Sequence, residues 1–232
     1  MLNKSLFICY STPNYSKLTN IFLNSLKELN VTNINHIIDT PSSKLLENSG
    51  FQTDLWFYCT RNKINHLINV LNNYETYIDI QYFIFTDCDI NYIKNNINEW
   101  NNLEKNIINE NKDIYFMHEN VSNDVNSGFF VIKNNNNINN IINFFIEVLK
   151  TIDITDKSNM PFGDQTIINN LKHTINYGFI SNDYVIFGTN IYNKNCCLFH
   201  HAVGCIDVND KIKQINYIKL RFESKYTRNK RR

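Results

Sequence analysis

The sequence predicts an α/β fold with a mixed, mainly parallel central sheet flanked by helices. Over the first 90 residues, apolar runs of strand length alternate with segments whose apolar residues recur at helical spacing. That order of strand, helix, strand, helix and strand is typical of parallel sheets. With 232 residues, of which 43% are hydrophobic, the chain can also bury the core that such a domain needs.

The first half of the chain supplies three strands and two helices. The first strand, residues 5–12 (SLFICYST), is an apolar run that ends in small hydroxyl residues. Residues 15–30 and 55–74 carry apolar side chains three and four positions apart, which predicts helices. Shorter apolar runs at 34–40 and 80–85 predict the second and third strands.

The second half mixes helices and strands in a less regular order. Helical spacing predicts three helices, at 97–110, 138–152 and 164–175. Apolar runs predict strand-like segments at 112–119, 127–134, 184–188 and 196–204. No internal repeat or linker divides the chain, so we expect one domain over residues 1–220, followed by a basic tail at 221–232.

Charge and cysteine content limit the partners and the compartment. The formal net charge of +1 gives no field that would attract nucleic acid, so no nucleic-acid partner is expected. The tail is either a solvated, frayed end or a weak contact with an anionic membrane surface. None of the six cysteines forms a CxxC pair, and neither a signal peptide nor a membrane-spanning run is seen. We therefore expect free thiols and a cytoplasmic protein, in the host cytoplasm if the gene is viral.

Two aspartates follow the third strand directly, in the stretch FIFTDCDI. Asp87 and Asp89 end an apolar run, and a buried carboxylate pair needs a compensating cation. Hard oxygen ligands suit Mg²⁺ or Mn²⁺, and such an ion commonly holds a diphosphate. In open α/β sheets ligands bind at the carboxyl ends of strands, which is where these residues lie. A simple turn or cap at a strand end is the alternative interpretation.

Two later segments carry polar side chains next to predicted strands or helices. Asn126 and Ser127 precede a glycine that leads into the strand GFFVIKN. Asp164 and Gln165 open the predicted helix after PFG. An aspartate at that position is also explained by helix capping and by the helix dipole.

A histidine pair lies near the end of the last predicted strand, in FHHAVGC. His201 precedes Gly204 by three residues, and an imidazole suits Mn²⁺ alongside carboxylates. His200 competes for the same role, and the spacing to Gly204 favours His201. A structural histidine within an apolar run is the simpler reading of either residue.

Together, and in this order, these motifs resemble the nucleotide-diphospho-sugar glycosyltransferases of the GT-A (Rossmann-like) fold. The sequence is most similar to the retaining galactosyl-, xylosyl- and mannosyltransferases of the galactomannan/xyloglucan type. The resemblance covers about residues 56 to 206 and rests on the blocks RNKINHLINVL, FIFTDCDI, NSGFFVIKN, GDQTIINNL and HAVGC. It implies a GT-A catalytic domain over 1–220.

The resemblance also implies a role for each matching residue. Asp87, Asp89 and His201 would bind Mn²⁺ or Mg²⁺, with Asp87 also near the ribose. Asp164 and Gln165 would face the reacting sugar as the catalytic residues. The other donor-binding residues would be Tyr10, Ser11 and Thr12 at the nucleoside, Lys63 at the phosphates, and Asn126, Ser127 and Gly204 beside the sugar. The family often has a lysine soon after His-x-x-Gly; here Lys211 is the nearest substitute.

The implied function is metal-dependent transfer of a hexose or pentose from a nucleotide sugar, UDP-linked as in most of the group. The acceptor would be a hydroxyl on a glycan, a protein or a lipid-linked sugar. Retention of configuration is expected because no second carboxylate is evident to deprotonate the acceptor, so the leaving phosphate would take that proton. Trp56 and Tyr58 are expected in the core rather than at the sugar.

Two alternatives remain from the residues themselves. A haloacid-dehalogenase-type phosphatase would use Asp87 as a nucleophile, although its aspartate pair usually lies on the first strand. A non-catalytic GT-A domain that binds a sugar nucleotide or a glycan would keep the fold without the activity. Hydrolysis of phosphate esters would identify the first, and donor binding without turnover the second.

Overall fold

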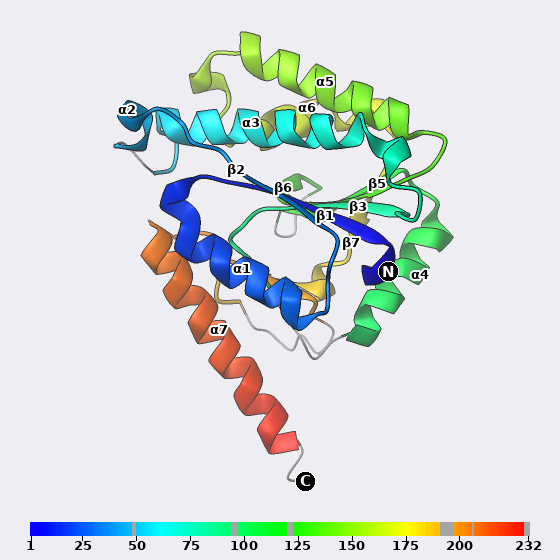
Figure 1. Cartoon of the computed structure of the whole chain (residues 1–232), viewed down its shortest axis with the longest axis vertical. Coiled ribbons are helices and arrows are strands. Elements are labelled where there is room, and N and C mark those ends of the chain that lie inside the picture. Colours follow the sequence, from blue (N-terminus) through cyan, green and yellow to red (C-terminus); the bar gives the residue numbers. More distant parts are fainter. Residues whose placement is uncertain (48–49, 94–96, 120–122, 191–196, 206, 230–232) are drawn as a thin grey trace.

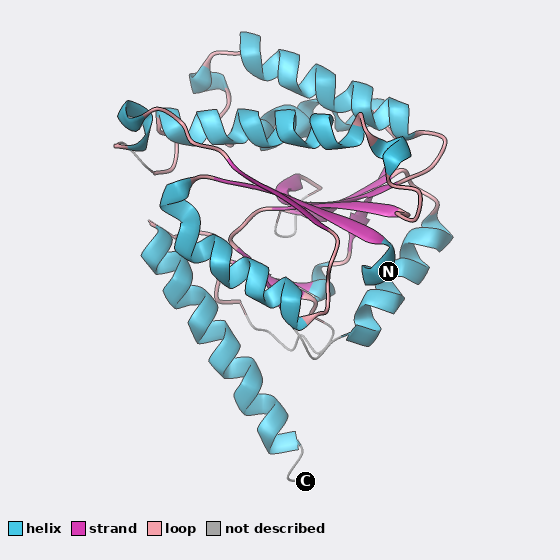
Figure 2. Cartoon of the chain, viewed as in Figure 1, coloured by secondary structure: helices cyan, strands magenta, loops and turns pink. Residues whose placement is uncertain are grey.

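The computed structural model shows a central sheet between two layers of helices (Figure 1). Colouring by secondary structure makes the layers plain, with the strands crossing the middle of the molecule (Figure 2). The described residues are 1–47, 50–93, 97–119, 123–190, 197–205 and 207–229.

The central sheet has six strands in the order β2-β1-β3-β6-β5-β7. β1 pairs in parallel with β2 and β3, and β5 with β7, whereas β6 runs antiparallel to its neighbours β3 and β5. The sheet is thus mixed and mainly parallel, as the sequence predicts. Its strands are Ser5–Ser11 (β1), Ile34–Ile38 (β2), Tyr82–Thr86 (β3), Ile114–His118 (β5), Val125–Lys133 (β6) and Tyr177–Ile180 (β7).

The helices divide between the two faces of this sheet (Figure 1). α3, α5 and α6 cover one face, and α1, α4 and α7 lie on the other side. The helices are Ser16–Glu28 (α1), Ser43–Leu46 (α2), Asp54–Leu71 (α3), Ile97–Glu110 (α4), Ile138–Ile154 (α5), Asp164–Leu171 (α6) and Val208–Asn229 (α7). Helical spacing in the sequence predicts α1, α3, α4, α5 and α6, but neither α2 nor α7.

Two hydrophobic cores follow from the alternation of side chains along each strand. In β1, Phe7 and Cys9 point into the core beneath α1 and α4, whereas Leu6 and Ile8 point into the core beneath α3 and α5. Every residue of β1 is buried. A strand covered on both faces has no polar side to show, which explains why it reads as a continuous apolar run.

A second, three-stranded sheet joins the segment that follows β3 to residues 185–201, which precede α7. Its order is β4-β9-β8, with strands Ile90–Tyr92 (β4), Val185–Phe187 (β8) and Phe199–His201 (β9). β4 and β9 are antiparallel, and Ile90 lies opposite His201. β4 starts one residue after Asp89, so this register sets that aspartate beside the histidine.

Four of the helices and strands were not expected from the sequence: α2, β4, β7 and α7. β4 has only three residues, and β7 contains Gly178, which weakens the strand pattern. α7 continues without a break across position 221, where we expected a tail to begin. The division into a domain and a tail stays a prediction, and residues 230–232 lie outside the described part of the chain.

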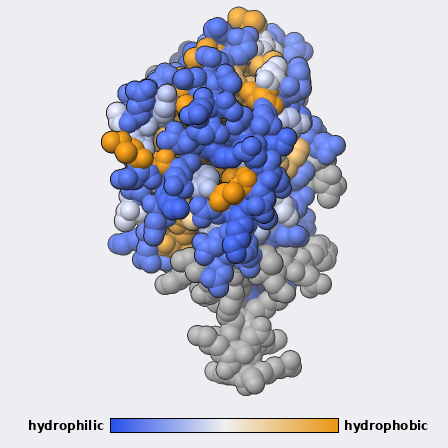
Figure 3. Space-filling view, turned by 90° about the vertical axis from the view of Figure 1, so that its right-hand side faces the viewer, coloured by the Kyte–Doolittle hydropathy of each residue, from blue (hydrophilic) through white to orange (hydrophobic). Residues whose placement is uncertain are grey.

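The surface seen in Figure 3 is mainly hydrophilic, with small separate hydrophobic patches. None of the described helices is both long and apolar enough to cross a lipid bilayer. Five of the six cysteines are free thiols, as expected, and Cys196 lies outside the described residues.

Candidate functional site

The candidate site lies where β1 and β3 end and β6 begins. Because β6 is antiparallel to β3, its first residues meet the last ones of β3, and the Asp87 N–H donates to the carbonyl of Gly128 at 2.8 Å. α6 begins beside the same edge with Asp164. The residues predicted from separate motifs therefore converge, and a single open cleft is lined by Lys63, Asp87, Asp89, Asn126, Ser127, Asp164, Gln165, His201 and Gly204.

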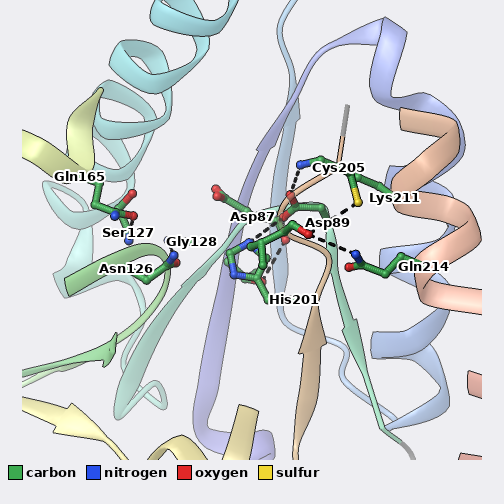
Figure 4. A network of polar contacts seen from close by, with 12 residues as sticks. Asp87, Asp89, Asn126, Ser127, Gly128, Gln165, His201, Cys205, Lys211 and Gln214 are labelled. Atoms are coloured by element: carbon green, nitrogen blue, oxygen red, sulfur yellow. Dashed lines mark hydrogen bonds and ion pairs between the residues drawn. The ribbon is translucent and has the colours of Figure 1, made fainter. Parts of the chain in front are cut away.

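Asp87, Asp89 and His201 form a cluster that could hold a metal ion. One ligand atom from each lies within 4.8 Å of the other two. Asp89 Oδ1 lies 3.3 Å from His201 Nε2. Figure 4 shows Asp89 in contact with His201, and Asp87 beside them, between the polar groups of β6 and those of α7. Asp89 and His201 are buried and Asp87 is half-buried, so the cluster faces the cleft through Asp87.

Two lysines supply positive charge on opposite sides of this cluster. Lys63 of α3 lies 3.4 Å from Asp87, and Lys211 of α7 forms an ion pair with Asp89. Burial alone would lower the pKa of each lysine, but the neighbouring carboxylates outweigh it and raise both pKa values. Burial likewise would raise the pKa of Asp89, but Lys211 and His201 bring it well below its usual range. Both lysines and Asp89 are thus charged at neutral pH.

The neighbouring histidine, His200, points elsewhere. Its Nε2 lies 2.9 Å from the carbonyl oxygen of Gly188. Its side chain is fully buried, and burial lowers its pKa to about 4. Adjacent residues of a strand face opposite sides, so only one of the two histidines of β9 can reach the aspartates. His201 is the one that does so, and His200 is a structural residue of the small sheet.

Asp164 is held deep in the site by Lys63. The Lys63 Nζ lies 3.1 Å from Asp164 Oδ2 and 3.4 Å from the hydroxyl of Ser127. Asp164 is only 1% exposed. Burial raises its pKa, Lys63 offsets part of that effect, and the result is about 6. Lys63 therefore bridges the aspartate at the end of β3 and the aspartate at the start of α6.

A carboxylate that the sequence motifs did not single out organises the amides of the site. Glu119 Oε2 accepts hydrogen bonds from the Asn126 side-chain amide at 2.6 Å and from the Gln165 amide at 3.2 Å. The amide oxygens of those two residues turn toward β6, where Asn126 accepts from the Gly128 N–H and Gln165 from the Ser127 N–H. Glu119 thus fixes the orientation of both amides.

Gly128 allows Asp87 and His201 to lie close to β6. A Cβ atom at this position would lie 2.6 Å from His201 Cε1 and 3.1 Å from Asp87 Oδ2. Real Cβ atoms do not come that close to another carbon, so any side chain here would displace the cluster. The motif Asn-Ser-Gly therefore has a steric reason for its glycine.

The end of β1 forms a second pocket that adjoins the cleft. Tyr10, Ser11 and Thr12 line it together with Lys63 and both aspartates. The Tyr10 hydroxyl donates a hydrogen bond to Asp39 at 2.6 Å, and Asp39 also accepts one from the Tyr58 hydroxyl at 2.9 Å.

The expectation that Trp56 and Tyr58 lie in the core is wrong. Both are half-buried, and Trp56 lines both the pocket at the end of β1 and the open cleft. Gly204, expected beside the donor, has a φ of 69° and no atom within 4 Å of a would-be Cβ. It lies at the edge of the cleft rather than in a tight contact.

Comparison with known proteins agrees with this arrangement. The sequence pattern of the nucleotide-diphospho-sugar transferase family matches residues 22–215. No curated protein sequence matches the chain.

Solved structures match the fold of the chain. One is a glycosyltransferase involved in the glycosylation of the major capsid of PBCV-1, with a TM-score of 0.61 and 12% identity over 91% of this chain and 99% of that one. Another is the apo form of the glycosyltransferase GlyE of Streptococcus pneumoniae TIGR4, with a TM-score of 0.54, 11% identity and 87% of this chain covered. This chain spans 55% of the GlyE chain. The fold is thus the GT-A fold of glycosyltransferases, and the chain belongs to the nucleotide-diphospho-sugar transferase family of enzymes.

Proposed function

We propose that this chain is a Mn²⁺-dependent glycosyltransferase that moves a sugar from a UDP-sugar to an acceptor hydroxyl with retention of configuration. The observation that carries the proposal is the cluster of Asp87, Asp89 and His201, flanked by Lys63 and Lys211 at the ends of the sheet strands. A nucleoside diphosphate needs this combination of a divalent ion and fixed positive charge. UDP and the galactomannan/xyloglucan subtype follow from the motif resemblance alone.

The side chains of the cluster fit Mn²⁺ better than Mg²⁺. Mg²⁺ prefers oxygen ligands and keeps much of its water, whereas Mn²⁺ accepts an imidazole with carboxylates. Donor atoms within 4.8 Å of one another need only small shifts to face one ion, because such bonds are about 2.1 Å long. When bound, the ion would neutralise the oxygens of the departing diphosphate.

The two lysines complement that charge from the protein side. Breaking the bond between the sugar and the diphosphate leaves negative charge on the leaving group. Lys63 and Lys211 lie on either side of the aspartates, and both stay protonated. Buried, preorganised cations of this kind stabilise charge as it develops and do not need to reorient during the reaction.

In the proposed reaction one bond to the anomeric carbon breaks, one forms, and one proton moves. The bond from the anomeric carbon to the diphosphate oxygen breaks, and a bond from the acceptor oxygen to the same carbon forms. The acceptor proton passes to the departing diphosphate oxygen on the same face, which gives retention. Asp164 and Gln165 would face the carbon while it has oxocarbenium character, with Asp164 held by Lys63 and Gln165 by Glu119.

The test is release of free nucleoside diphosphate from a panel of UDP- and GDP-sugars, with and without Mn²⁺. We expect slow hydrolysis of one donor that depends on Mn²⁺ and is lost in Asp89→Asn. No turnover of any donor would overturn the proposal. Donor-dependent stabilisation without turnover would then identify a binding module, and hydrolysis of a generic phosphate ester would identify a phosphatase. NMR of the product would test retention, since an inverted anomer contradicts it.

The adjacent histidines provide a matched control for the metal. In His201→Ala we expect the affinity for Mn²⁺, measured by calorimetry, to fall at least tenfold. In His200→Ala we expect lower thermal stability, because the Gly188 carbonyl loses its partner, with Mn²⁺ affinity kept within about twofold. Equal loss of Mn²⁺ affinity in both variants would contradict the assignment.

A further inference from the structure

Two phenylalanines that line the cleft are more than half exposed to solvent. Phe51 is 59% exposed and Phe162 is 57% exposed. Both line the same cleft as Lys63 and Asp164, although they come from segments more than 100 residues apart in the chain. Large apolar side chains that stay exposed beside a site are typical of a surface that binds something.

Direct contacts hold the first of these rings against α3. The ring of Phe51 packs edge-on against that of Trp56, with centroids 4.8 Å apart and planes at 62°. The neighbouring residue, Gln52, donates a hydrogen bond from its side-chain amide to the carbonyl of Pro161 at 3.1 Å. Pro161 precedes Phe162, so this bond ties together the two segments that carry the exposed rings.

Gly163 brings the second segment close to the same helix. It has a φ of 55°, and a Cβ here would lie 2.9 Å from the Trp56 ring and 2.9 Å from the Thr60 hydroxyl oxygen. A residue with a side chain could not take this position. Phe51, Trp56 and Phe162 therefore belong to one part of the cleft lining, which we call the aromatic wall.

The same cleft also has polar lining residues. It carries the carboxylates and amides of Glu119, Asp124, Asn126, Asn169 and Asn170. Asn169 is fixed by hydrogen bonds to both the N–H and the carbonyl of Val125, at 2.8 and 3.0 Å. The cleft thus combines exposed aromatic rings with hydrogen-bonding groups.

The aromatic wall leads to the reacting groups along one face of α3. Trp56, Thr60 and Lys63 are spaced four and three residues apart, so they share that face. From Trp56 to Lys63 the helix rises roughly 10 Å. A molecule that rests on the wall would therefore reach toward the proposed donor from the open side of the cleft.

We propose that the aromatic wall binds the acceptor and that the acceptor is a pyranose glycan. A pyranose ring has a face of C–H groups, which stacks on aromatic rings, and an edge of hydroxyls, which suits amides and carboxylates. The aromatic rings and the polar groups that line the cleft match these two surfaces. The inference rests on the proposed function and goes beyond it by choosing a glycan over a protein or lipid acceptor.

Binding can be tested with intrinsic fluorescence and an array. The chain has two tryptophans, and Trp100 is only 1% exposed, so a ligand at the cleft changes the emission of Trp56. The protein with UDP and Mn²⁺ is applied to immobilised pyranosyl oligosaccharides and to serine- and threonine-containing peptides. A hit among the oligosaccharides is then titrated in solution. We expect a glycan signal and a change in emission that Trp56→Phe abolishes.

The role of the wall is tested by kinetics with that glycan. In Phe51→Ala and Phe162→Ala we expect the KM for the glycan to rise about fivefold to tenfold, with the KM for the donor changed less than twofold. Ile78→Ala is the matched control, because Ile78 is 90% exposed and does not line the cleft. It should change neither KM.

Three results would overturn the proposal. Binding of peptides but not of glycans would assign a protein acceptor. A rise in the donor KM in the phenylalanine variants would assign the wall to the nucleoside. Unchanged KM values for both substrates would leave the wall without a role in binding. In each case Mn²⁺-dependent donor hydrolysis would still support the proposed function, whereas its absence would remove that function itself.

Discussion

Lys211 of α7 and Asp89 at the end of β3 form an ion pair although 122 residues separate them in the chain. The side chains are 21% and 11% exposed, so most of the pair is removed from water. The last helix therefore provides part of the charge balance of the site, and the same contact leads to a first prediction.

Lys211→Met should destabilise the metal-free protein, by about 3 kcal/mol, because it leaves a buried carboxylate without its cation. Added Mn²⁺ should raise the melting temperature of Lys211→Met more than that of the parent protein, since the ion replaces the lost charge at Asp89. Thermal scans with and without Mn²⁺ measure this. Lys213→Met is the control on the same helix, and its side chain is 77% exposed. An equal loss in both variants would contradict the role of the buried pair.

Gly128→Ala should weaken metal binding more than folding. The new methyl group would meet His201 and Asp87 at distances too short for contact, so the two ligands must move apart. We expect the Mn²⁺ affinity to fall more than tenfold by calorimetry. Gly204→Ala is the control, because Gly204 has a φ of 69° but no atom lies within 4 Å of a would-be Cβ. This variant should lose about 1 kcal/mol of stability through backbone strain and keep its affinity for Mn²⁺. The reverse pattern would refute this prediction.

Asp164 should make the stability of the protein depend on pH. Its pKa in the folded protein is about 6, raised by burial from the usual 3.8. Because the folded state holds the proton more tightly, this group favours folding most below pH 3.8, and that contribution is lost as pH rises through 6. Asp164→Asn should therefore gain stability relative to the parent between pH 4 and 7, by up to about 3 kcal/mol.

Denaturant titrations at pH 4.5 and 7.5 measure this difference. Asp79→Asn is the control, because Asp79 is an exposed carboxylate on the surface. A difference between Asp164→Asn and the parent that stays constant across this range would show that the carboxyl is not the source of the pH dependence.

Glu119→Gln should lower kcat while leaving the KM for the donor nearly unchanged. Both amides donate to the same carboxylate oxygen, and a glutamine that keeps an oxygen there lacks the charge that strengthens the two hydrogen bonds. Asn126 and Gln165 are then held less firmly, and the weakening of two charge-assisted hydrogen bonds should cost about 2 kcal/mol, or roughly thirtyfold in rate. Asp124→Asn, at an exposed position of the same cleft, serves as the comparison. A change in donor KM alone would argue against a positioning role.

The sequence predicted the convergence of Asp87, Asp89 and His201 because each lies beside an apolar strand, where burial makes a polar side chain informative. It also predicted the order of elements up to β3, where strands and helices alternate with clear periodicity. The parallel pairing of β1 and β3 then brought the first and third strand ends together.

Other parts of the site carried no such signal. Glu119 follows β5 as a lone carboxylate, and its importance comes from amides on β6 and α6 that only the folded chain brings near. Lys211 was named only as a substitute for an expected lysine, because α7 is rich in polar residues and was not recognised as a helix. Phe51 and Phe162 lie in short loop segments without periodicity, so the sequence could not show that they line the same cleft.

The register of β4 against β9 has a consequence for the order in which the site is made. Residue 201 is synthesised 112 residues after residue 89 (201 − 89). At ordinary rates of translation, about 5 to 20 residues per second, the aspartates leave the ribosome roughly 6 to 22 seconds before the histidine. A nascent chain can pair β1 with β3 in that interval, but it carries two carboxylates still without their imidazole. The candidate metal site is therefore among the last features to be completed, after the sheet that supports it.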